Sequence, residues 1–164
     1  MNDKQETLTI IGRAERIAFL ELNIKSVPAK VDTGADTSSV WAGSVVLKDD
    51  DLHVVFFSPE SEFYTGTTHV FPKNTYSVTR ISNSFGHKEI RYKLKLKVKI
   101  KKRVVRATFT LSDRSQKLYP VLLGRKLLNG KFLVDVQKGK PLRAAETARS
   151  EQLKAELNNI RGEL

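Results

Sequence analysis

The sequence predicts a mostly β protein, a barrel or a sandwich, with one short internal helix and a second helix at the C-terminus. Short runs of β-branched, aromatic and aliphatic residues recur through residues 8–136, separated by Gly, Pro and Asp. Between Tyr92 and Lys101, apolar residues alternate with lysines, as in a strand with one buried face. Helical periodicity is confined to two places. Frequent short strands with turn signals favour a β architecture.

The predicted strands are short runs between turn-forming residues. Gly12, Pro28, Pro72 and Gly86 separate them, because these residues favour turns and interrupt strand pairing. An apolar segment at residues 119–123 is predicted as a buried strand. The other predicted strands are residues 8–11, 17–24, 29–31, 53–57, 77–81, 90–100, 104–111 and 132–136.

Two helices are predicted. The first covers residues 125–128 and is followed by Asn129 and Gly130, a pair that suits a helix C-terminus. The second lies in the tail, where apolar residues recur at spacings of four, three and four and form a narrow stripe. These residues are Leu153, Leu157, Ile160 and Leu164.

The tail pattern begins after Pro141, which places a domain boundary near residue 142. We therefore expect a β domain of residues 1–142 and a C-terminal helical tail of residues 143–164. An amphipathic tail helix is expected to pack on its own domain or on a dimer partner. A frayed, solvated helix is the alternative.

Composition limits the class of protein and its partners. The 164 residues include no cysteine, which excludes disulfides and thiolate metal ligands. The N-terminus does not read as a secretory signal, and no apolar run approaches the roughly 20 residues that cross a bilayer. We therefore expect a soluble, cytoplasmic protein without a membrane partner. The net charge of +11, concentrated in residues 1–142, favours acidic partners.

Residues 29–40 have the composition of a catalytic loop. They read AKVDTGADTSSV, so Asp32, Thr33 and Gly34 follow directly on an apolar strand. A carboxylate there is presented on a tight loop, glycine permits close backbone approach, and the threonine hydroxyl can fix the loop. The same residue types also form ordinary Asx turns, so the tripeptide alone does not decide between the two.

Residues 119–128 make the interpretation more specific. They read YPVLLGRKLL, a buried strand that ends in Gly124 and Arg125 and runs into a short helix. In this order, the two segments resemble those of the retropepsin-like aspartic peptidases. There, a DTGA loop and a later apolar-apolar-Gly-Arg-x-x-Leu segment form the two halves of one lobe. The resemblance implies a single-lobe, retropepsin-like acid-protease barrel, with a short helix after the Gly-Arg motif.

Further motifs resemble a bacterial family described as ATP-dependent zinc proteases. Residues 30–38, 84–91 and 113–125 match its Lys-x-Asp-Thr-Gly-Ala, Ser-x-Gly-x-x-x-x-Arg and Leu-Leu-Gly-Arg blocks, and the resemblance covers roughly residues 8–136. Members often carry a histidine after the Thr-Ser pair, where this chain has none, and a lysine where it has Asp36. The first departure weakens a zinc role, and the second strengthens the aspartic-peptidase interpretation.

The resemblance implies a mechanism based on two carboxylates that share one proton, with one acting as base and the other as acid. The chain has one DTG and no internal repeat, so a symmetric homodimer with two copies of Asp32 at its axis is the simplest source of the pair. Thr33 would lock the paired loops across that axis. Asp36 and Arg125 would form a partly buried, bidentate ion pair beside the site.

The implied site has a catalytic loop, Asp32, Thr33 and Gly34, and a β-hairpin flap from residues 79–91. An ordinary hairpin loop is the alternative to the flap. No cofactor and no metal ion is expected. The residues expected to bind substrate are Ala35, Asp36, Ser84, Phe85, Gly86, Arg91 and Arg125.

The expected substrate is a peptide or protein, including a glutamylated one. Members of the bacterial family are associated with ATP-grasp ligases that add glutamates, and the lysine-rich strand at residues 92–101 would attract such a polyanion. A solvated strand face that discourages edge pairing is the alternative. Nucleic acid is a weaker candidate, because Tyr92 is the one aromatic residue of the basic segment 88–106.

Two other functions stay open at this point. The chain could retain the fold as a catalytically inactive peptide-binding module, or it could be a metal-dependent hydrolase. The histidines His53, His69 and His87 lack a spacing typical of metal ligands. Substitution of Asp32 separates the peptidase from the inactive module, and chelators separate it from a metalloenzyme.

Overall fold

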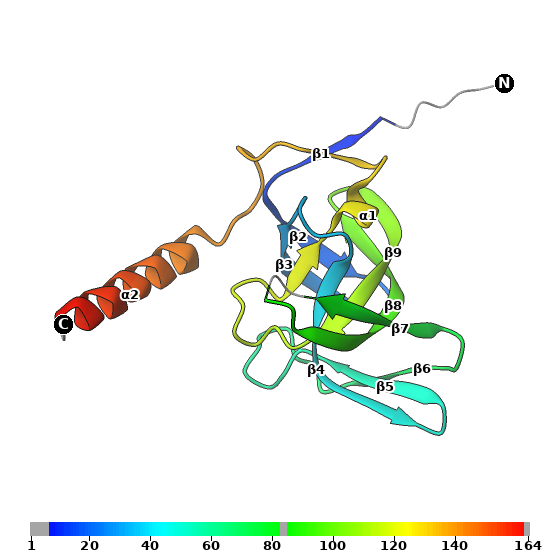
Figure 1. The fold of residues 1–164 in the computed structure, drawn as a ribbon. Helices are drawn as coiled ribbons and strands as arrows, with labels where there is room; N and C mark the ends of the chain where they lie inside the picture. The colour runs from blue at the N-terminus through cyan, green and yellow to red at the C-terminus, as the bar shows by residue number, and fades with distance from the viewer. Residues whose placement is uncertain (1–6, 83–84, 163–164) are drawn as a thin grey trace.

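The computed structural model describes residues 7–82 and 85–162, and most of its strands belong to one closed barrel (Figure 1). The barrel strands are β2 (Ala14–Phe19), β3 (Ile24–Val31), β4 (Ser38–Lys48), β8 (Lys88–Ile100), β9 (Arg103–Ser112) and β10 (Val121–Leu123). They pair in the order β10–β3–β2–β8–β9–β4, and β4 pairs with β10 to close the ring. The prediction of a mainly β, single-lobe barrel is confirmed.

The remaining elements extend this ring. The outer half of β4 pairs with β5 (Asp51–Phe56), which pairs with β6 (Thr68–Phe71), and β7 (Tyr76–Ser82) forms a hairpin with β8. A separate parallel pair joins β1 (Thr9–Ile11) to β11 (Phe132–Val134). The helices are α1 (Arg125–Leu128) and α2 (Arg143–Gly162).

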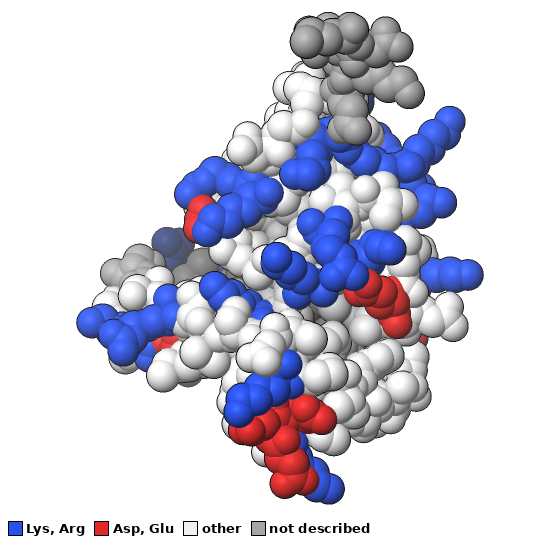
Figure 2. All heavy atoms as spheres, turned by 90° about the vertical axis from the view of Figure 1, so that its right-hand side faces the viewer, with Lys and Arg blue, Asp and Glu red and all other residues white. Residues whose placement is uncertain are grey.

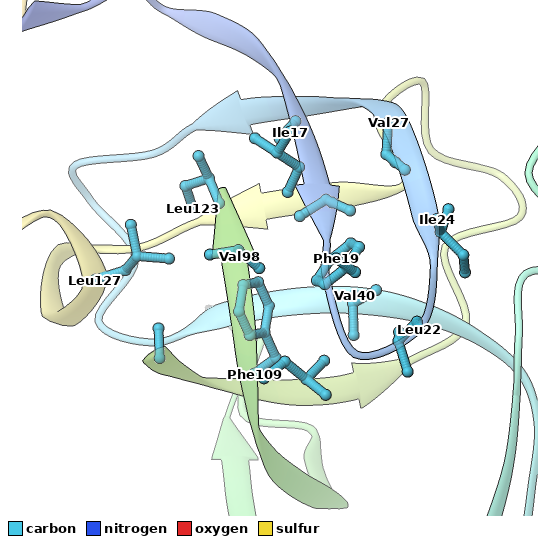
Figure 3. Close-up of a cluster of buried hydrophobic side chains, with 14 of the residues drawn as sticks. Ile17, Phe19, Leu22, Ile24, Val27, Val40, Val98, Phe109, Leu123 and Leu127 are labelled. Atoms are coloured by element: carbon cyan, nitrogen blue, oxygen red, sulfur yellow. The ribbon is translucent and has the colours of Figure 1, made fainter. Parts of the chain in front are cut away.

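The core fills the barrel with side chains from strands that are distant in the sequence (Figure 3). Phe19 of β2 and Phe109 of β9 meet edge to face, with ring centroids 5.5 Å apart. Along β8, Leu94, Leu96 and Val98 are buried while the lysines between them are exposed. The predicted alternation is therefore confirmed, and the lysines lie on the outer face of the barrel.

Two strand predictions are wrong in detail. The run 17–24 is interrupted by a turn between β2 and β3, where Asn23 adopts a left-handed φ of 54°. Pro28, predicted to separate two strands, lies inside β3 opposite Arg16 of β2. Strand β10 pairs with β3 only from Ala29 onward, so the N–H that Pro28 lacks costs no hydrogen bond to β10.

Strand β4 was not predicted from the sequence, because its barrel half begins with two serines, Ser38 and Ser39, ahead of the apolar residues 40–42. Ser38 and Ser39 are buried, with their hydroxyl groups hydrogen-bonded inside the barrel. The Ser39 Oγ lies 2.7 Å from the Ser112 Oγ of β9. Tertiary hydrogen bonds thus replace the apolar pattern on which sequence-based strand prediction depends.

The junction between β10 and α1 lies against the loop that follows β3. The Gly124 N–H donates to the Ser38 hydroxyl at 3.0 Å. A Cβ at Gly124 would lie 2.7 Å from the carbonyl carbon of Thr37 and 3.0 Å from the Ala35 oxygen. The predicted helix at residues 125–128 is confirmed, and it begins directly after this close contact.

The tail forms a helix as expected, but α2 does not pack on its own domain. It projects away from the barrel in Figure 1, and none of its residues is buried. Its stripe residues Leu153, Leu157 and Ile160 are each more than half exposed. The stripe therefore does not pack against the same domain, and packing against a dimer partner stays a prediction. Among residues 7–82 and 85–162, no helix combines the length and the apolarity that a bilayer crossing requires.

The first turn of α2 is attached to the barrel by Glu146. The Arg13 guanidinium donates to both oxygens of Glu146, at 2.9 and 2.8 Å, and the Tyr119 hydroxyl donates at 2.7 Å. The Tyr119 oxygen in turn accepts from the Leu142 N–H. The bonds from Arg13 and then Tyr119 lower the pKa of Glu146 from its ordinary 4.5 to about 2.

We predict that acid weakens the attachment of α2. Because the pKa of Glu146 is lower in the folded protein, the contribution of its carboxylate is complete above about pH 4.5 and is lost as the pH falls through about 2. NMR shifts of the Tyr119 ring and the Leu142 amide should follow this transition. Glu146→Gln should give the released spectrum at neutral pH, whereas Glu151→Gln, on the exposed part of α2, should not.

We also predict that Gly124→Ala destabilises the barrel by about 1–3 kcal/mol, because backbone atoms must move to admit the methyl group. Urea unfolding measures the change. The matched control is Gly162→Ala, since a Cβ there meets no atom within 4 Å. Equal stability of the two variants would contradict the role assigned to this contact.

Candidate active site

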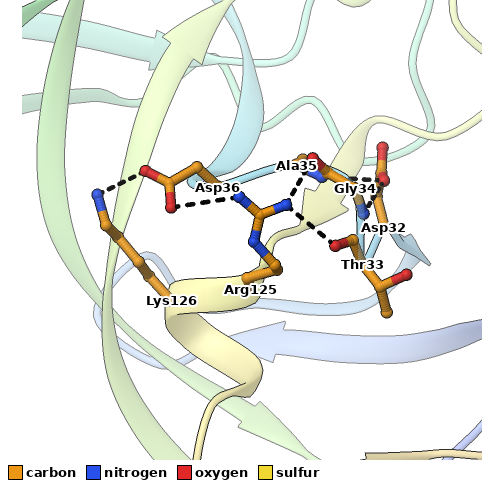
Figure 4. Close-up of polar contacts among 7 residues, drawn as sticks. All are labelled: Asp32, Thr33, Gly34, Ala35, Asp36, Arg125 and Lys126. Carbon is orange, nitrogen blue, oxygen red and sulfur yellow. Dashed lines mark hydrogen bonds and ion pairs between the residues drawn. The ribbon is translucent and has the colours of Figure 1, made fainter.

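Asp32 lies at the end of β3, on a loop that the backbone holds in place (Figure 4). The Asp32 N–H donates to the Leu123 carbonyl at 2.9 Å, which extends the pairing of β3 with β10. One carboxylate oxygen, Oδ1, accepts from the Gly34 N–H at 2.9 Å and from the Ala35 N–H at 3.1 Å. The carboxylate is half-buried, and no donor among the described residues reaches its Oδ2.

Arg125 supports the same loop from α1. Its Nη1 donates to the Thr33 carbonyl at 3.2 Å and to the Gly34 carbonyl at 2.9 Å. Its backbone N–H donates to the Ala35 carbonyl at 2.8 Å. Arg125 therefore positions the loop that carries Asp32. The sequence-based interpretation had instead expected Arg125 to bind substrate.

The predicted ion pair of Asp36 and Arg125 needs correction. Their charged atoms lie 3.8 Å apart in a single contact, and both side chains are more than half exposed. The Nζ of Lys126 is closer, 2.7 Å from Oδ2 of Asp36, and this bond is the main reason that the pKa of Asp36 is lowered. Arg125 is directed instead to the loop carbonyls, so the pair is neither buried nor bidentate within this chain.

A groove of about 620 Å³ runs between this loop and the β7–β8 hairpin. Ala35 and Asp36 line it from the loop side, and Arg91 lines it from β8. The hairpin predicted at residues 79–91 is present, with Ser82 opposite Lys88. Its β7 strand supplies one wall of the groove, through Thr79, Arg80, Ile81 and Ser82.

Phe85 and Gly86, two of the residues expected to bind substrate, do not line the groove. Phe85 is 88% exposed beyond the paired part of the hairpin. Gly86 has a φ of 80°, a conformation that favours glycine. Ser84 lies outside the described residues. Of the residues expected to bind substrate, the groove therefore brings together Ala35, Asp36 and Arg91.

Four basic residues of the groove were not assigned to the site from the sequence: Arg80, Lys93, Arg114 and Lys126. Arg114 follows β9 and donates through Nε to the Tyr119 carbonyl at 3.0 Å. Burial and the nearby charge of Arg91 lower the pKa of Arg114, while Asp32 opposes this change. The signal available in the sequence was the Asp-Arg-Ser block at residues 113–115.

In the part of the chain that the structure describes, no three His, Asp or Glu side chains gather in a way that could hold a metal ion. The imidazole of His69 packs edge to face on Phe56, and burial lowers its pKa. The described residues near Asp32 are therefore a second carboxylate, Asp36, backbone amides and several cationic side chains.

Comparison with solved structures supports the fold. A protein of unknown function from Legionella pneumophila subsp. pneumophila str. Philadelphia 1 superposes with a TM-score of 0.62 at 22% identity, over 81% of this chain and 97% of that one. Because the identity is low, this similarity concerns the fold alone.

Comparison with curated sequences finds longer proteins. One from Desulfotalea psychrophila, named "Probable alpha-L-glutamate ligase", is 30% identical over 128 residues, and one of the same name from Shewanella pealeana is 30% identical over 134 residues. Each alignment covers 77% of this chain, which spans 28% of the length of each relative. A family model described as retropepsin-like aspartic endopeptidase RimB matches residues 10–141, so the chain belongs to the RimB-like family.

Proposed function

We propose that this protein is an aspartic peptidase in which Asp32 is the catalytic residue. The observation that carries the proposal is the geometry of the Asp32 loop. Two backbone amides bind Oδ1, while Oδ2 receives no donor from the described residues. The carboxylate is thus fixed in orientation with one oxygen available to a water molecule or a second carboxylate.

The proposed reaction needs two copies of Asp32 that share one proton. The ionised carboxylate accepts a proton from water as the water oxygen bonds to the scissile carbonyl carbon. The protonated partner donates a hydrogen bond to the carbonyl oxygen. The C–N bond then breaks as the amide nitrogen receives a proton, and the products are a carboxylate and an amine. The two copies titrate as one unit, so neither has a fixed role.

A homodimer is the proposed source of the second carboxylate. Thr33 and Gly34 are exposed beside Asp32, as a loop at a two-fold axis requires. A shallow pocket connects Thr33 to Phe132 and Val134 of β11. The β1–β11 pair next to it exposes apolar side chains, including Ile10 at 42% and Leu133 at 53%. Apolar side chains on this face support a contact with a second copy.

Removal of glutamate from a glutamylated peptide or protein is the substrate class that we propose. The relatives with a glutamate ligase name carry a region similar to this chain within a longer protein. Basic side chains outnumber acidic ones on the face shown in Figure 2, and Lys95, Lys97 and Lys99 lie on the outer face of β8. A polyanionic substrate would be attracted to these charges, more strongly at low salt.

Asp32→Asn should abolish cleavage of glutamylated peptide, because an amide can neither accept the water proton as a base nor share a proton with its partner. Peptide hydrolysis followed by mass spectrometry measures the loss. Asp49→Asn is the matched control: Asp49 has a φ of 51°, which asparagine also tolerates, and it lies in the β4–β5 turn. Equal hydrolysis by wild type and Asp32→Asn would contradict the proposal.

Leu133→Glu should convert the dimer to a monomer and lower activity at least 100-fold, because a carboxylate would lose its solvation at the interface. Sedimentation equilibrium and the peptide assay measure the two effects. Val46→Glu is the control, since Val46 is also 53% exposed but lies on the outer half of β4. A fully active Leu133→Glu monomer would show that catalysis does not require this interface.

A further inference from the structure

Two arginines, Arg91 and Arg114, line the groove beside the Asp32 loop. Ala35, whose N–H binds the Asp32 carboxylate, also lines it. The two arginines come from different elements, Arg91 from β8 and Arg114 from the segment after β9. Their common location near the proposed catalytic carboxylate makes them candidates for substrate recognition.

Arg91 is largely buried and only partly satisfied. Its side chain is 24% exposed, and its Nη2 donates to the more exposed Glu89 at 2.7 Å. Its Nε–H is buried and finds no acceptor among the described residues. A buried donor without a partner costs free energy, so a ligand that supplied an acceptor would be favoured.

The positive charge of Arg114 is balanced by less nearby negative charge than that of Arg91. Its Nε donates to a backbone carbonyl, and among residues 7–82 and 85–162 no carboxylate lies within ion-pair distance of its guanidinium. Burial, and then the charge of Arg91, lower the pKa of Arg114, while Asp32 opposes this change. Both guanidinium side chains line the same groove. One anion placed between them would stabilise both.

The rest of the groove adds positive charge. Lys93, Lys126 and Arg80 also line it, while the one acidic residue of its lining, Asp36, is paired with Lys126 at 2.7 Å. The free charge of the groove is therefore positive. A carboxylate is the anion expected there, because its two oxygens match the paired N–H groups of a guanidinium.

We propose that Arg91 and Arg114 form a clamp for a carboxylate of the substrate, and so determine specificity for peptides that carry a carboxylate next to the cleaved bond. This inference rests on the proposed peptidase function. The carboxylate has two possible sources: the side chain of a glutamate or the C-terminal end of the peptide. Both present the same planar, charged group, and peptides in which each group is neutralised separately distinguish them.

The test compares four peptides of one sequence, with glutamate or glutamine beside the cleaved bond and with a free or an amidated C-terminus. The wild-type protein should cleave the peptide that carries the recognised carboxylate about 10- to 100-fold faster, as kcat/KM, than its neutral counterpart. Arg91→Gln and Arg114→Gln should each reduce this preference at least tenfold. Cleavage of the doubly neutral peptide, which offers the clamp no carboxylate, should fall less than cleavage of the acidic peptide.

The controls distinguish a loss of the clamp from a general loss of positive charge and from a loss of folding stability. Arg161→Gln, on the exposed end of α2, removes one positive charge and should keep the full preference. Arg114→Lys keeps the charge but loses the planar fork, so its preference should be intermediate. Thermal unfolding of each variant should match the wild type. An unchanged preference in both glutamine variants, or an equal loss on all four peptides, would overturn the clamp.

A binding measurement separates the clamp from the peptidase. In Asp32→Asn protein, calorimetry should give at least tenfold weaker binding of the acidic peptide when Arg114→Gln is added. If binding weakens in this way but the wild-type protein cleaves none of the peptides, the clamp is supported and the peptidase function is refuted. Cleavage by the wild type without preference for the acidic peptide, and without this loss of binding, would refute the clamp and leave the peptidase standing.

Discussion

The fold and the site both depend on the pairing of β10 with its neighbours. This three-residue strand joins β3 in parallel and β4 in antiparallel orientation, and so closes the barrel. At the last residue of β10, the Leu123 carbonyl accepts a hydrogen bond from the Asp32 N–H. Arg125 donates to the carbonyls of the two residues that follow Asp32. The contacts that complete the ring are therefore continuous with those that present the carboxylate.

This continuity explains why glycine stands at position 124. The chain passes so close to the Thr37 backbone that a side chain would collide with it. At the same point, the Gly124 N–H finds an acceptor in a buried serine hydroxyl. The Gly-Arg sequence that follows β10 thus has two physical functions: the glycine permits the approach of two backbones, and the arginine stabilises the loop on the other side.

The sequence could predict the elements whose information is local. The alternation in β8 and the four-residue helix α1 were read from period and composition, and Asp32 from its position after an apolar strand. Strand β4 was missed because its buried serines are hydrogen-bonded to Ser112 of β9 and to Gly124, which follows β10. Arg114 was missed because its location in the groove depends on the path of the chain after β9. Such contacts between distant residues leave no periodic signal.

The attachment of α2 through a single carboxylate affects the overall shape of the molecule. At 1.5 Å per residue, a helix of 20 residues is about 30 Å long, comparable to the diameter of a small domain. A compact barrel with such a rod experiences more frictional drag than a sphere of equal mass. Elution from a sizing column would therefore overstate the mass of one chain, and only methods independent of shape can count the subunits.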